Sequence, residues 1–469
     1  MTIPTDPDVS KVDWAAFAKA LAPVPLITEP ALVKQKSRDF YWYSPILKEK
    51  LNKTFGDIVA VPRDEADVLH VARTCVKWKV PVTVRGAGTG NYGQAMPLFG
   101  GLVLDMTEMN KVLWCRQGVG RFQAGANLKA IDAELRPQGW ELRMHPSTKR
   151  TATIGGFIAG GSGGVGSIAF GQLRDRGSVL GLRVVTMTDE PEVIELRGDD
   201  VQKANHAYGT NGIITELEIP LGPAHDWSDQ IVLFDDFGQS IRFAQALGES
   251  DGILKKLVTT IAWPIPVWFR QLRDAMPDNK HAVIAMIAEP FREPFRELVK
   301  QWGGTISYDK TFAEIEARLT PLYEYSWNHT TLQALKVDKG ITYLQSLFPP
   351  GQNIELVEQM AAHFGDEVLM HCEFVRWGGR VTNSALQIVR YTTAERLREI
   401  IKFHEDHGVR IADPHTYVLE DGGMKVINAD QLGFKLRTDP HGLMNPGKMR
   451  GWYQRDKLET GHKSLYSGA

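Results

Sequence analysis

Residues 80–93 read Val-Pro-Val-Thr-Val-Arg-Gly-Ala-Gly-Thr-Gly-Asn-Tyr-Gly, an apolar run followed at once by glycine at nearly every second position. The run predicts a short buried strand, and the glycines predict a loop directly after it. Glycine adopts positive φ readily and lets several backbone N–H groups turn toward one anion, which a pyrophosphate requires. A dinucleotide-binding βαβ unit would begin a helix here, whereas the next apolar run, residues 102–105, reads as another strand. The stretch therefore indicates a phosphate cradle of a different class, with a simple tight turn as the alternative.

A second glycine-rich stretch, residues 153–166, reads Thr-Ile-Gly-Gly-Phe-Ile-Ala-Gly-Gly-Ser-Gly-Gly-Val-Gly. Each glycine costs backbone entropy on folding, so we expect a reason beyond packing for so many of them. Neither stretch continues into the Gly-Lys-Ser/Thr of a P-loop, which argues against an NTPase. Two separate glycine loops fit one long ligand that touches both, and a flexible lid is the alternative for the second loop.

The segments around these loops predict an α+β fold. Residues 58–62 read as a strand, and Asp64 is placed to cap a helix whose apolar residues recur at three- and four-residue steps. Further strands are expected at 179–187 and 212–219, with a helix at 128–138 before them. This N-terminal unit ends near Pro223.

Residues 225–425 contain fewer glycines and alternate strands with helices. The predicted strands are 281–287, 305–308, 367–374, 384–391 and 409–412, and the predicted helices are 294–302 and 392–407. Such units suggest a single antiparallel sheet with helices on one face. We expect three parts: an N-terminal domain at 1–222, a substrate or cap domain at 223–425, and a segment at 426–469 that returns to the first domain.

The overall composition excludes several classes of partner. The 469 residues include 54 basic and 56 acidic side chains, giving a formal charge of −2 and no basic surface for nucleic acid or an anionic membrane. The three cysteines are too few and too scattered for a disulfide framework or a CxxC metal site. No run approaches the ~18 apolar residues of a membrane span, and the N-terminus lacks a signal-peptide pattern. We expect a cytoplasmic protein with a small-molecule substrate and no integral membrane segment; peripheral association with the inner membrane stays open.

Six motifs occur in the order and roughly at the spacing of one class of flavoproteins. They are PVTVRGAGTG (81–90), LVLDM (102–106), TIGGFIAGGSGG (153–164), VLGLRVV (179–185), GTNGIITELEIPL (209–221) and GLMNPGK (442–448). In these motifs the chain resembles the FAD-linked oxidoreductases of the PCMH/vanillyl-alcohol-oxidase class, and within it the D-lactate and glycolate dehydrogenase branch (the glycolate oxidase catalytic-subunit type). The resemblance implies an α+β fold with a PCMH-type, two-subdomain FAD-binding domain and a ferredoxin-like α+β cap.

The resemblance also implies FAD as the cofactor. The first glycine loop would hold the pyrophosphate, and the second would run beside the isoalloxazine and the ribityl chain. Members with covalent FAD carry a histidine in the first loop, where this chain has Thr89, so we predict non-covalent FAD. The cofactor-binding residues implied in this way are Arg85, Gly86, Ala87, Gly88, Thr89, Gly90, Asn91, Pro146, Thr153, Gly155, Gly156, Ser162, Gly163, Ile213, Ile214 and Asn445.

The substrate side departs from the pattern of this branch. A flavin dehydrogenase needs a base for the hydroxyl proton, usually a histidine, and a carboxylate substrate suits an arginine. The branch carries two histidines around a GDGN core and a later Glu-His-Gly, which bind a divalent metal; residues 369–380 and 411–417 each keep one histidine without these motifs. We predict a metal-free active site, with a metal held also by Glu373 or Asp413 as the alternative. The predicted catalytic residues are His415, His371 and His329, and the predicted substrate-binding residues are Arg376, Arg380 and Tyr417.

The function expected from this resemblance is an FAD-dependent dehydrogenase that oxidises a hydroxyl-bearing carbon, in this branch most often of a 2-hydroxy acid. Hydride would pass to flavin N5 with a histidine as base, and electrons would go on to a quinone, a cytochrome or an electron-transfer flavoprotein. One alternative is a flavin oxidase or reductase of the same fold that acts on an aromatic or apolar alcohol or an alkene. Another is a non-catalytic FAD-binding subunit of a larger dehydrogenase complex. The oligomeric state stays open.

Overall fold

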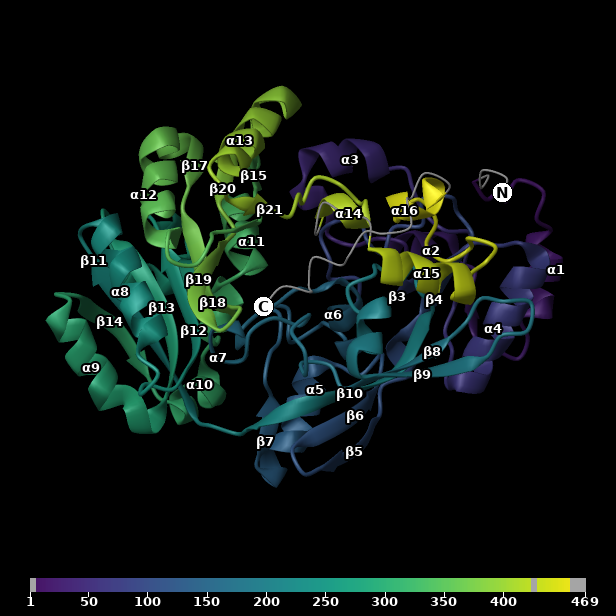
Figure 1. Cartoon of the computed structure of the whole chain (residues 1–469), viewed down its shortest axis with the longest axis horizontal. Helices are drawn as coiled ribbons and strands as arrows, with labels where there is room; N and C mark the ends of the chain where they lie inside the picture. The colour runs from purple at the N-terminus through teal and green to yellow at the C-terminus, as the bar shows by residue number, and fades with distance from the viewer. Residues whose placement is uncertain (1–5, 423–427, 456–469) are drawn as a thin grey trace.

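The computed structural model describes residues 6–422 and 428–455 (Figure 1). Its first sheet has the strand order β1 (Leu26–Ile27), β2 (Ile58–Ala60), β4 (Leu102–Asp105), β3 (Val82–Arg85), in which β2, β4 and β3 run parallel. Between β2 and β3 the chain forms α4 (Glu65–Trp78), which is capped by Asp64 as predicted. Glycines follow β3, and no helix lies between β3 and β4, so this part of the sequence prediction is confirmed.

A second, antiparallel sheet completes the N-terminal region, by which we mean residues 6–223. It contains β5 (Val112–Arg116), β6 (Val119–Gln123), β10 (Ile213–Pro223), β8 (Gly181–Val185) and β9 (Val193–Arg197), with β7 (Trp140–Leu142) paired to the end of β10. The helices α5 (Leu128–Leu135), α6 (Ile154–Gly160) and the short α7 (Ser167–Phe170) lie between its strands in the sequence, and α5 and α6 pack on it. A large apolar core forms between these helices and β6, β8 and β10.

The second glycine-rich stretch differs from its prediction as a loop, because its first half is the helix α6. The Thr153 hydroxyl accepts the backbone N–H of Gly156 at 3.3 Å and caps the helix. A Cβ on Gly155 would lie 2.6 Å from the Cβ of Ala124, so the missing side chain lets the helix pack directly on the chain after β6. Glycine at position 155 thus allows close packing. Because glycine has a low helix propensity, the residue pattern predicted a loop where the structure has a helix.

The cap region (residues 227–411) is built on one eight-stranded antiparallel sheet, in agreement with the prediction. Its strand order is β14 (Thr305–Lys310), β11 (Trp227–Phe234), β13 (His281–Ala288), β12 (Lys255–Ile261), β18 (His371–Trp377), β19 (Arg380–Ala385), β16 (Ser346–Leu347), β21 (Arg410–Ile411). Four helices pack on one face: α8 (Phe237–Glu249), α9 (Arg292–Gln301), α12 (Asn353–Phe364) and α13 (Ala394–Asp406). The prediction of helices on one face implied that the other face is uncovered, and the structure differs on this point. It is covered by η5 (Ile265–Trp268), η6 (Arg270–Ala275), η8 (Leu322–Tyr325) and α11 (Asn328–Val337), together with tyrosines of the N-terminal region.

Two predicted strands of the cap region are wrong in their extent. The segments 367–374 and 384–391 each divide, and β17 (Val368–Leu369) and β20 (Ile388–Arg390) leave the main sheet to join β15 (Ile341–Tyr343) in a small sheet of their own. Neither segment contains glycine or proline at the break, so the residue pattern gives no signal for it.

The end of the described chain returns to the first sheet. Val82 N–H donates to Leu443 O at 2.8 Å and Asn445 N–H donates to Val82 O at 2.7 Å, so residues 443–445 pair with β3 just before the first glycine loop. In Figure 1 the yellow helices α14 (Leu419–Gly422), α15 (Ala429–Thr438) and α16 (Arg450–Tyr453) lie on the same side of the molecule as β3 and β4. Within the described ranges, no helix is both long and apolar enough to cross a membrane.

Candidate functional site

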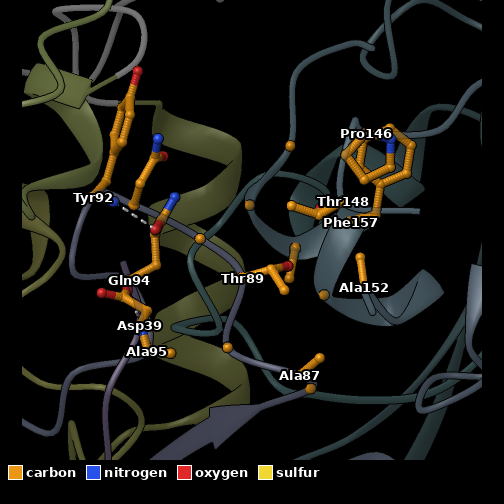
Figure 2. A pocket seen from close by; sticks show the side chains of 18 of the residues that line it. Asp39, Ala87, Thr89, Tyr92, Gln94, Ala95, Pro146, Thr148, Ala152 and Phe157 are labelled. Atoms are coloured by element: carbon orange, nitrogen blue, oxygen red, sulfur yellow. Dashed lines mark hydrogen bonds between the residues drawn. The ribbon is translucent and has the colours of Figure 1, made fainter. Parts of the chain in front are cut away.

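A cavity of about 240 Å³ lies where the two glycine segments of the N-terminal region meet the cap region. Figure 2 shows Ala87 and Thr89 of the first glycine loop facing Pro146, Ala152 and Phe157 across it. The cap region closes the cavity with residues around the start of α11 and with two side chains from elsewhere. These cap residues are Trp327, Asn328, His329, Leu332, Gln345 and Leu386.

The first glycine loop presents a row of unpaired backbone donors to the cavity. Within residues 6–422 and 428–455, the backbone amides of residues 87–91 have no protein acceptor. Gly88 has φ +69°, which only glycine adopts without strain. Such a row of donors is an anion-binding concavity.

Arg85 shapes this loop from behind. Its Nε donates to Gly86 O at 3.0 Å and its Nη2 donates to Ala87 O at 2.7 Å. Its Nη1 donates to the carbonyl groups of Lys36 and Arg38. The guanidinium therefore ties the glycine loop to residues 36–38, and it adds positive potential beside the cradle.

The two glycine segments touch, and the contact depends on a missing side chain. A Cβ on Gly86 would lie 1.9 Å from the hydroxyl oxygen of Thr153, at the start of α6. Gly160, at the end of α6, behaves differently: it lines the cavity, and a Cβ there would meet only Gln94, at 3.5 Å. Since the protein itself has room for a side chain at this helical position, glycine at 160 fits a wall that a bound group covers.

Several buried polar groups at the cavity have no partner within the described chain. They are Asn91 Nδ2, the Tyr208 hydroxyl and Asn328 Oδ1. An unpaired buried polar atom costs about 1–3 kcal/mol, so native proteins seldom keep several in one place without a ligand or ordered water to pair them. Together with the free loop amides, they make this cavity chemically suited to a long polar ligand such as FAD.

His206 and Tyr208 are cavity residues that the sequence analysis missed. Both have positive φ, 51° and 52°, which is uncommon for residues other than glycine. His206 Nδ1 lies 2.8 Å from Gly161 O, and burial lowers the pKa of this histidine to about 4, so the ring is neutral at pH 7. No residue pattern marks these two positions, because backbone strain becomes visible only in the folded chain.

A histidine and a carboxylate face each other at the cap end of the cavity. His329 Nδ1 lies 3.0 Å from Glu324 Oε2, and Arg150 Nε lies 3.1 Å from the other carboxylate oxygen. Bonding of Nδ1–H to the carboxylate orients the ring and leaves Nε2 to accept a proton. Among the three histidines predicted to be catalytic, His329 is the one that lines the cavity.

The structure places the other two candidate bases away from the cavity. His415 is buried with Nδ1 2.8 Å from the Ser44 hydroxyl and Nε2 2.9 Å from Tyr343 O, so both ring nitrogens are engaged. His371 is fully buried under α11, with Nε2 2.8 Å from Glu373 Oε1. Period-two spacing places His371 and Glu373 on one face of a strand, but only the tertiary structure shows that this face is covered.

The predicted substrate-binding residues also lie outside the cavity. Arg376 donates to Ile168 O at 3.1 Å and pairs with Asp251 near the surface. Arg380 is exposed at the turn between β18 and β19, and Tyr417 packs near the buried Leu51. The lining of the cavity thus includes none of these three residues, and their place in the sequence does not say which end of an element reaches the cavity.

Most of the predicted cofactor residues do line the cavity, with two exceptions. Ile213 and Asn445 lie behind its wall. Asn445 donates from Nδ2 to Gln94 O at 2.8 Å and to Tyr208 O at 2.6 Å. It therefore fastens the first glycine loop and the His206–Tyr208 turn to the C-terminal segment.

The described lining of the cavity contains one cationic side chain, Arg85, and one carboxylate, Asp39. Asp39 accepts backbone N–H groups from Tyr41 at 2.9 Å and Ala95 at 3.2 Å, yet burial raises its pKa to about 6. Burial also lowers the pKa of the nearby Lys448 to about 7. No three His, Cys, Asp or Glu side chains of the described residues are grouped so as to hold a metal ion.

Residues 56–195 match the family of FAD binding domains. The matched range contains both glycine segments and ends before the cap region. FAD is therefore the cofactor of the N-terminal region, as the sequence motifs implied.

Two characterised relatives match different lengths of the chain. The D-lactate dehydrogenase of Anaerostipes hadrus is 34% identical over 37% of this chain and 38% of its own length. The glycolate oxidase subunit GlcD of Bacillus subtilis (strain 168) is 25% identical over 85% of this chain and 89% of its own length. The chain thus spans well under half of the first relative, in a match of 184 residues.

A solved structure of alkyldihydroxyacetonephosphate synthase superposes on the whole fold. Its TM-score is 0.67 at 17% sequence identity, over 95% of this chain and 88% of that chain. A likeness at this identity shows the fold alone, and it confirms the expected α+β architecture with a PCMH-type FAD-binding domain.

Proposed function

We propose that this chain, whose N-terminal region is an FAD-binding domain, is a dehydrogenase that oxidises the hydroxyl-bearing carbon of a 2-hydroxy acid. The observation that carries the proposal is one cavity lined both by the first glycine loop, whose amides have no protein acceptor, and by His329, which pairs with Glu324. In this proposal residues 1–222 and 426–469 hold the cofactor and residues 223–425 select the substrate.

The FAD would be held by the backbone amides of the first glycine loop and by the wall of α6. When bound, FAD supplies an acceptor for the hydride that leaves the carbinol carbon. His329 takes the hydroxyl proton on Nε2, and Glu324 stabilises the imidazolium that forms. Trp327, Tyr43, Tyr92 and Tyr208 line the cavity, and their rings would limit the access of water to the bound substrate.

Support for a 2-hydroxy acid comes from two of the relatives, a D-lactate dehydrogenase and a glycolate oxidase subunit. On the cap side of the cavity, the side chains available to bind the carboxylate of such a substrate are neutral donors, the amides of Asn328 and Gln345. Electrons would leave to a quinone, a cytochrome or an electron-transfer flavoprotein. With Thr89 in the first loop, the FAD would be bound without a covalent link.

A second candidate substrate is an aromatic or apolar alcohol. The observation that favours it is the cap end of the cavity, where Trp327, Leu332 and Leu386 form the wall and the described lining provides no second cation to bind a carboxylate. A third outcome, a structural FAD subunit without turnover, would follow if no substrate reduces the flavin.

The deciding experiment follows the flavin absorbance of the purified holoprotein under anaerobic conditions. D-lactate, glycolate, D-2-hydroxyglutarate and an aromatic alcohol are added in turn, and bleaching with a hydroxy acid is the expected result. His329→Asn should slow bleaching by about 10²–10⁴-fold, the usual contribution of a general base. His441→Asn, an exposed histidine paired with Asp189, is the matched control and should leave the rate unchanged.

Bleaching with the aromatic alcohol alone would favour the second candidate substrate, and bleaching with none of the four would remove the dehydrogenase proposal. The same preparation tests the cofactor linkage: acid denaturation should release all the FAD into the supernatant. Flavin that stays with the precipitated protein would contradict non-covalent binding.

A further inference from the structure

Trp327 holds a backbone conformation that its side chain disfavours. Its φ of 52° and ψ of −140° lie in a region that glycine adopts readily and a bulky residue avoids. Trp327 is the N-cap residue of α11, and the next two residues are Asn328 and His329 of the cavity wall. A strained residue persists only where its neighbours fix it, so the surroundings of Trp327 must supply a restraint.

One buried carboxylate supplies this restraint. Glu373, on β18 and 1% exposed, accepts the Trp327 backbone N–H through Oε1 at 2.5 Å. Its other oxygen accepts the Thr259 hydroxyl at 2.6 Å, which fixes the carboxylate from the neighbouring strand β12. With its second oxygen fixed by Thr259, this buried side chain keeps Oε1 in place to hold the Trp327 amide against strain.

His371 extends the same cluster to a second residue of the cavity wall, Leu386. Its Nε2 lies 2.8 Å from Glu373 Oε1, and its Nδ1 lies 3.2 Å from the carbonyl of Leu386. The Leu386 N–H donates back to His371 O at 2.9 Å, and the Leu386 residue lines the cavity. Thr330, on the first turn of α11, lies 3.2 Å from the same Nε2 through its hydroxyl. The cluster thus connects two parts of the cavity wall, at Trp327 and at Leu386, that are far apart in the sequence.

We propose that Glu373, supported by His371, is a positioning residue that holds the Trp327 amide and so presents Asn328 and His329 to the substrate. Neither Glu373 nor His371 reaches the cavity, and each acts through the backbone that it binds. The consequence for the substrate rests on the proposed function of His329, whereas the restraint itself is a property of the protein without substrate.

The restraint is tested by hydrogen exchange of the full-length protein, with and without FAD, followed in peptides that cover residues 322–335. Glu373→Ala should accelerate exchange there by at least about tenfold, because the start of α11 loses its anchor. Glu373→Gln should stay within about threefold of the wild type, since its amide oxygen can accept the same N–H. Glu289→Ala is the matched control: Glu289 also accepts a backbone N–H in the cap region, from Phe312 at 2.7 Å, and its loss should leave residues 322–335 unchanged.

A second variant shows whether Glu373 acts on the strain of Trp327. Glycine takes this conformation at no steric cost, so in a Trp327→Gly background Glu373→Ala should accelerate exchange much less than in the wild type. Equal acceleration in both backgrounds would overturn the proposal and leave Glu373 as general support for the fold. If Glu373→Ala does not fold, Thr259→Val loosens the same carboxylate, and it should accelerate exchange by a smaller factor that again disappears beside glycine at 327.

Kinetics of the holoenzyme separate this proposal from the proposed function. Glu373→Ala should lower kcat by at least about tenfold and Glu373→Gln should restore it, while the Kd for FAD stays within about twofold because the glycine segments are untouched. Faster exchange with an unchanged kcat would overturn the positioning role. If the wild type oxidises none of the substrates tried, the proposed function fails, and the exchange experiment alone still decides whether Glu373 restrains Trp327.

Discussion

Unusual backbone angles mark the candidate site residue by residue. Three residues other than glycine that line the cavity have positive φ: His206, Tyr208 and Trp327. A fourth, Asn445 with φ 40°, ties two cavity segments together from behind. Strain of about 1–3 kcal/mol for each such residue is commonly found where a protein positions groups for function. The cavity therefore combines strained backbone with unpaired polar atoms.

A change at one residue separates cofactor binding from fold stability. Gly160→Ala places a methyl group where the protein leaves room, and alanine is the better helix former, so the free energy of unfolding of the apoprotein should stay equal or rise by up to about 1 kcal/mol. The same methyl group enters the cavity wall, so the Kd for FAD should rise by about tenfold or more. Flavin fluorescence titration and chemical denaturation measure the two effects.

Gly433→Ala is the matched control for this prediction. Gly433 lies in α15 away from the cavity, with nothing within 4 Å of an added Cβ. It should match Gly160→Ala in stability and leave the Kd for FAD unchanged. An unchanged Kd for Gly160→Ala would mean that the cofactor does not cover this wall.

Among the elements, the segment from η8 to α11 brings the cap region to the cavity. Two buried acidic side chains of the cap sheet hold this segment in place: Glu373 accepts the Trp327 N–H, and Asp229 of β11 accepts the Leu322 N–H at 2.7 Å. Residue pattern predicts neither contact, because each joins residues about fifty to ninety positions apart through a sheet whose strand order follows from packing. The same holds for the division of the predicted strands 367–374 and 384–391.

The carboxyl group of Asp229 makes the stability of the folded protein depend on pH. Burial raises the pKa of Asp229 to about 7 from a usual value of 3.8, and its Oδ1 has no partner within the described chain. The folded protein keeps this proton up to about pH 7, whereas the unfolded chain loses it above about pH 4. The unfolded state thus binds fewer protons across this window, so Asp229 removes stability as the pH rises through it, by about 4 kcal/mol in total.

Asp229→Asn should abolish this loss, because an amide does not ionise. Relative to the wild type, the variant should gain stability steadily from pH 4 to pH 7, as measured by urea denaturation of the apoprotein. Asp235→Asn, at an exposed position paired with Lys280, is the control and should show no such trend. A constant difference between Asp229→Asn and the wild type would contradict the raised pKa.

At the scale of the whole molecule, a buried ion pair joins the two regions that enclose the cavity. Glu141 of β7 accepts the Lys256 ammonium of β12 at 2.5 Å and the Trp227 indole N–H at 2.9 Å. Both ionic side chains are less than 5% exposed, so neither can turn to water if its partner is removed. The pair joins the cap sheet to the N-terminal region.

Lys256→Met should lower the free energy of unfolding by about 3–5 kcal/mol, because it leaves the Glu141 charge buried with one cation fewer. The double variant Lys256→Met/Glu141→Gln should recover part of this loss. Lys280→Met removes an exposed pair with Asp235 and should change stability by less than about 1 kcal/mol. Thermal and urea unfolding of the three variants check these values, and equal losses for Lys256→Met and Lys280→Met would contradict a structural role for the buried pair.

The sequence by itself determined the FAD-binding half of this protein. The glycine loop after β3, the absence of a helix behind it and the order of the six motifs predicted the fold class and the cofactor, and the same loop provides the cavity's free amides. This was possible because a phosphate cradle is local: a few consecutive residues create both its backbone angles and its donors.

Only the tertiary structure decided which residues of the cap region line the cavity. His329 reaches the cavity, while His371 and His415 are buried behind it and Arg376 and Arg380 point elsewhere. The physical reason is that these side chains come from strands and helices distant in the sequence, and which face or end of an element meets the cavity is set by sheet order and packing. The residue type fixes the chemistry of each side chain, and the tertiary structure fixes which side chains line the cavity.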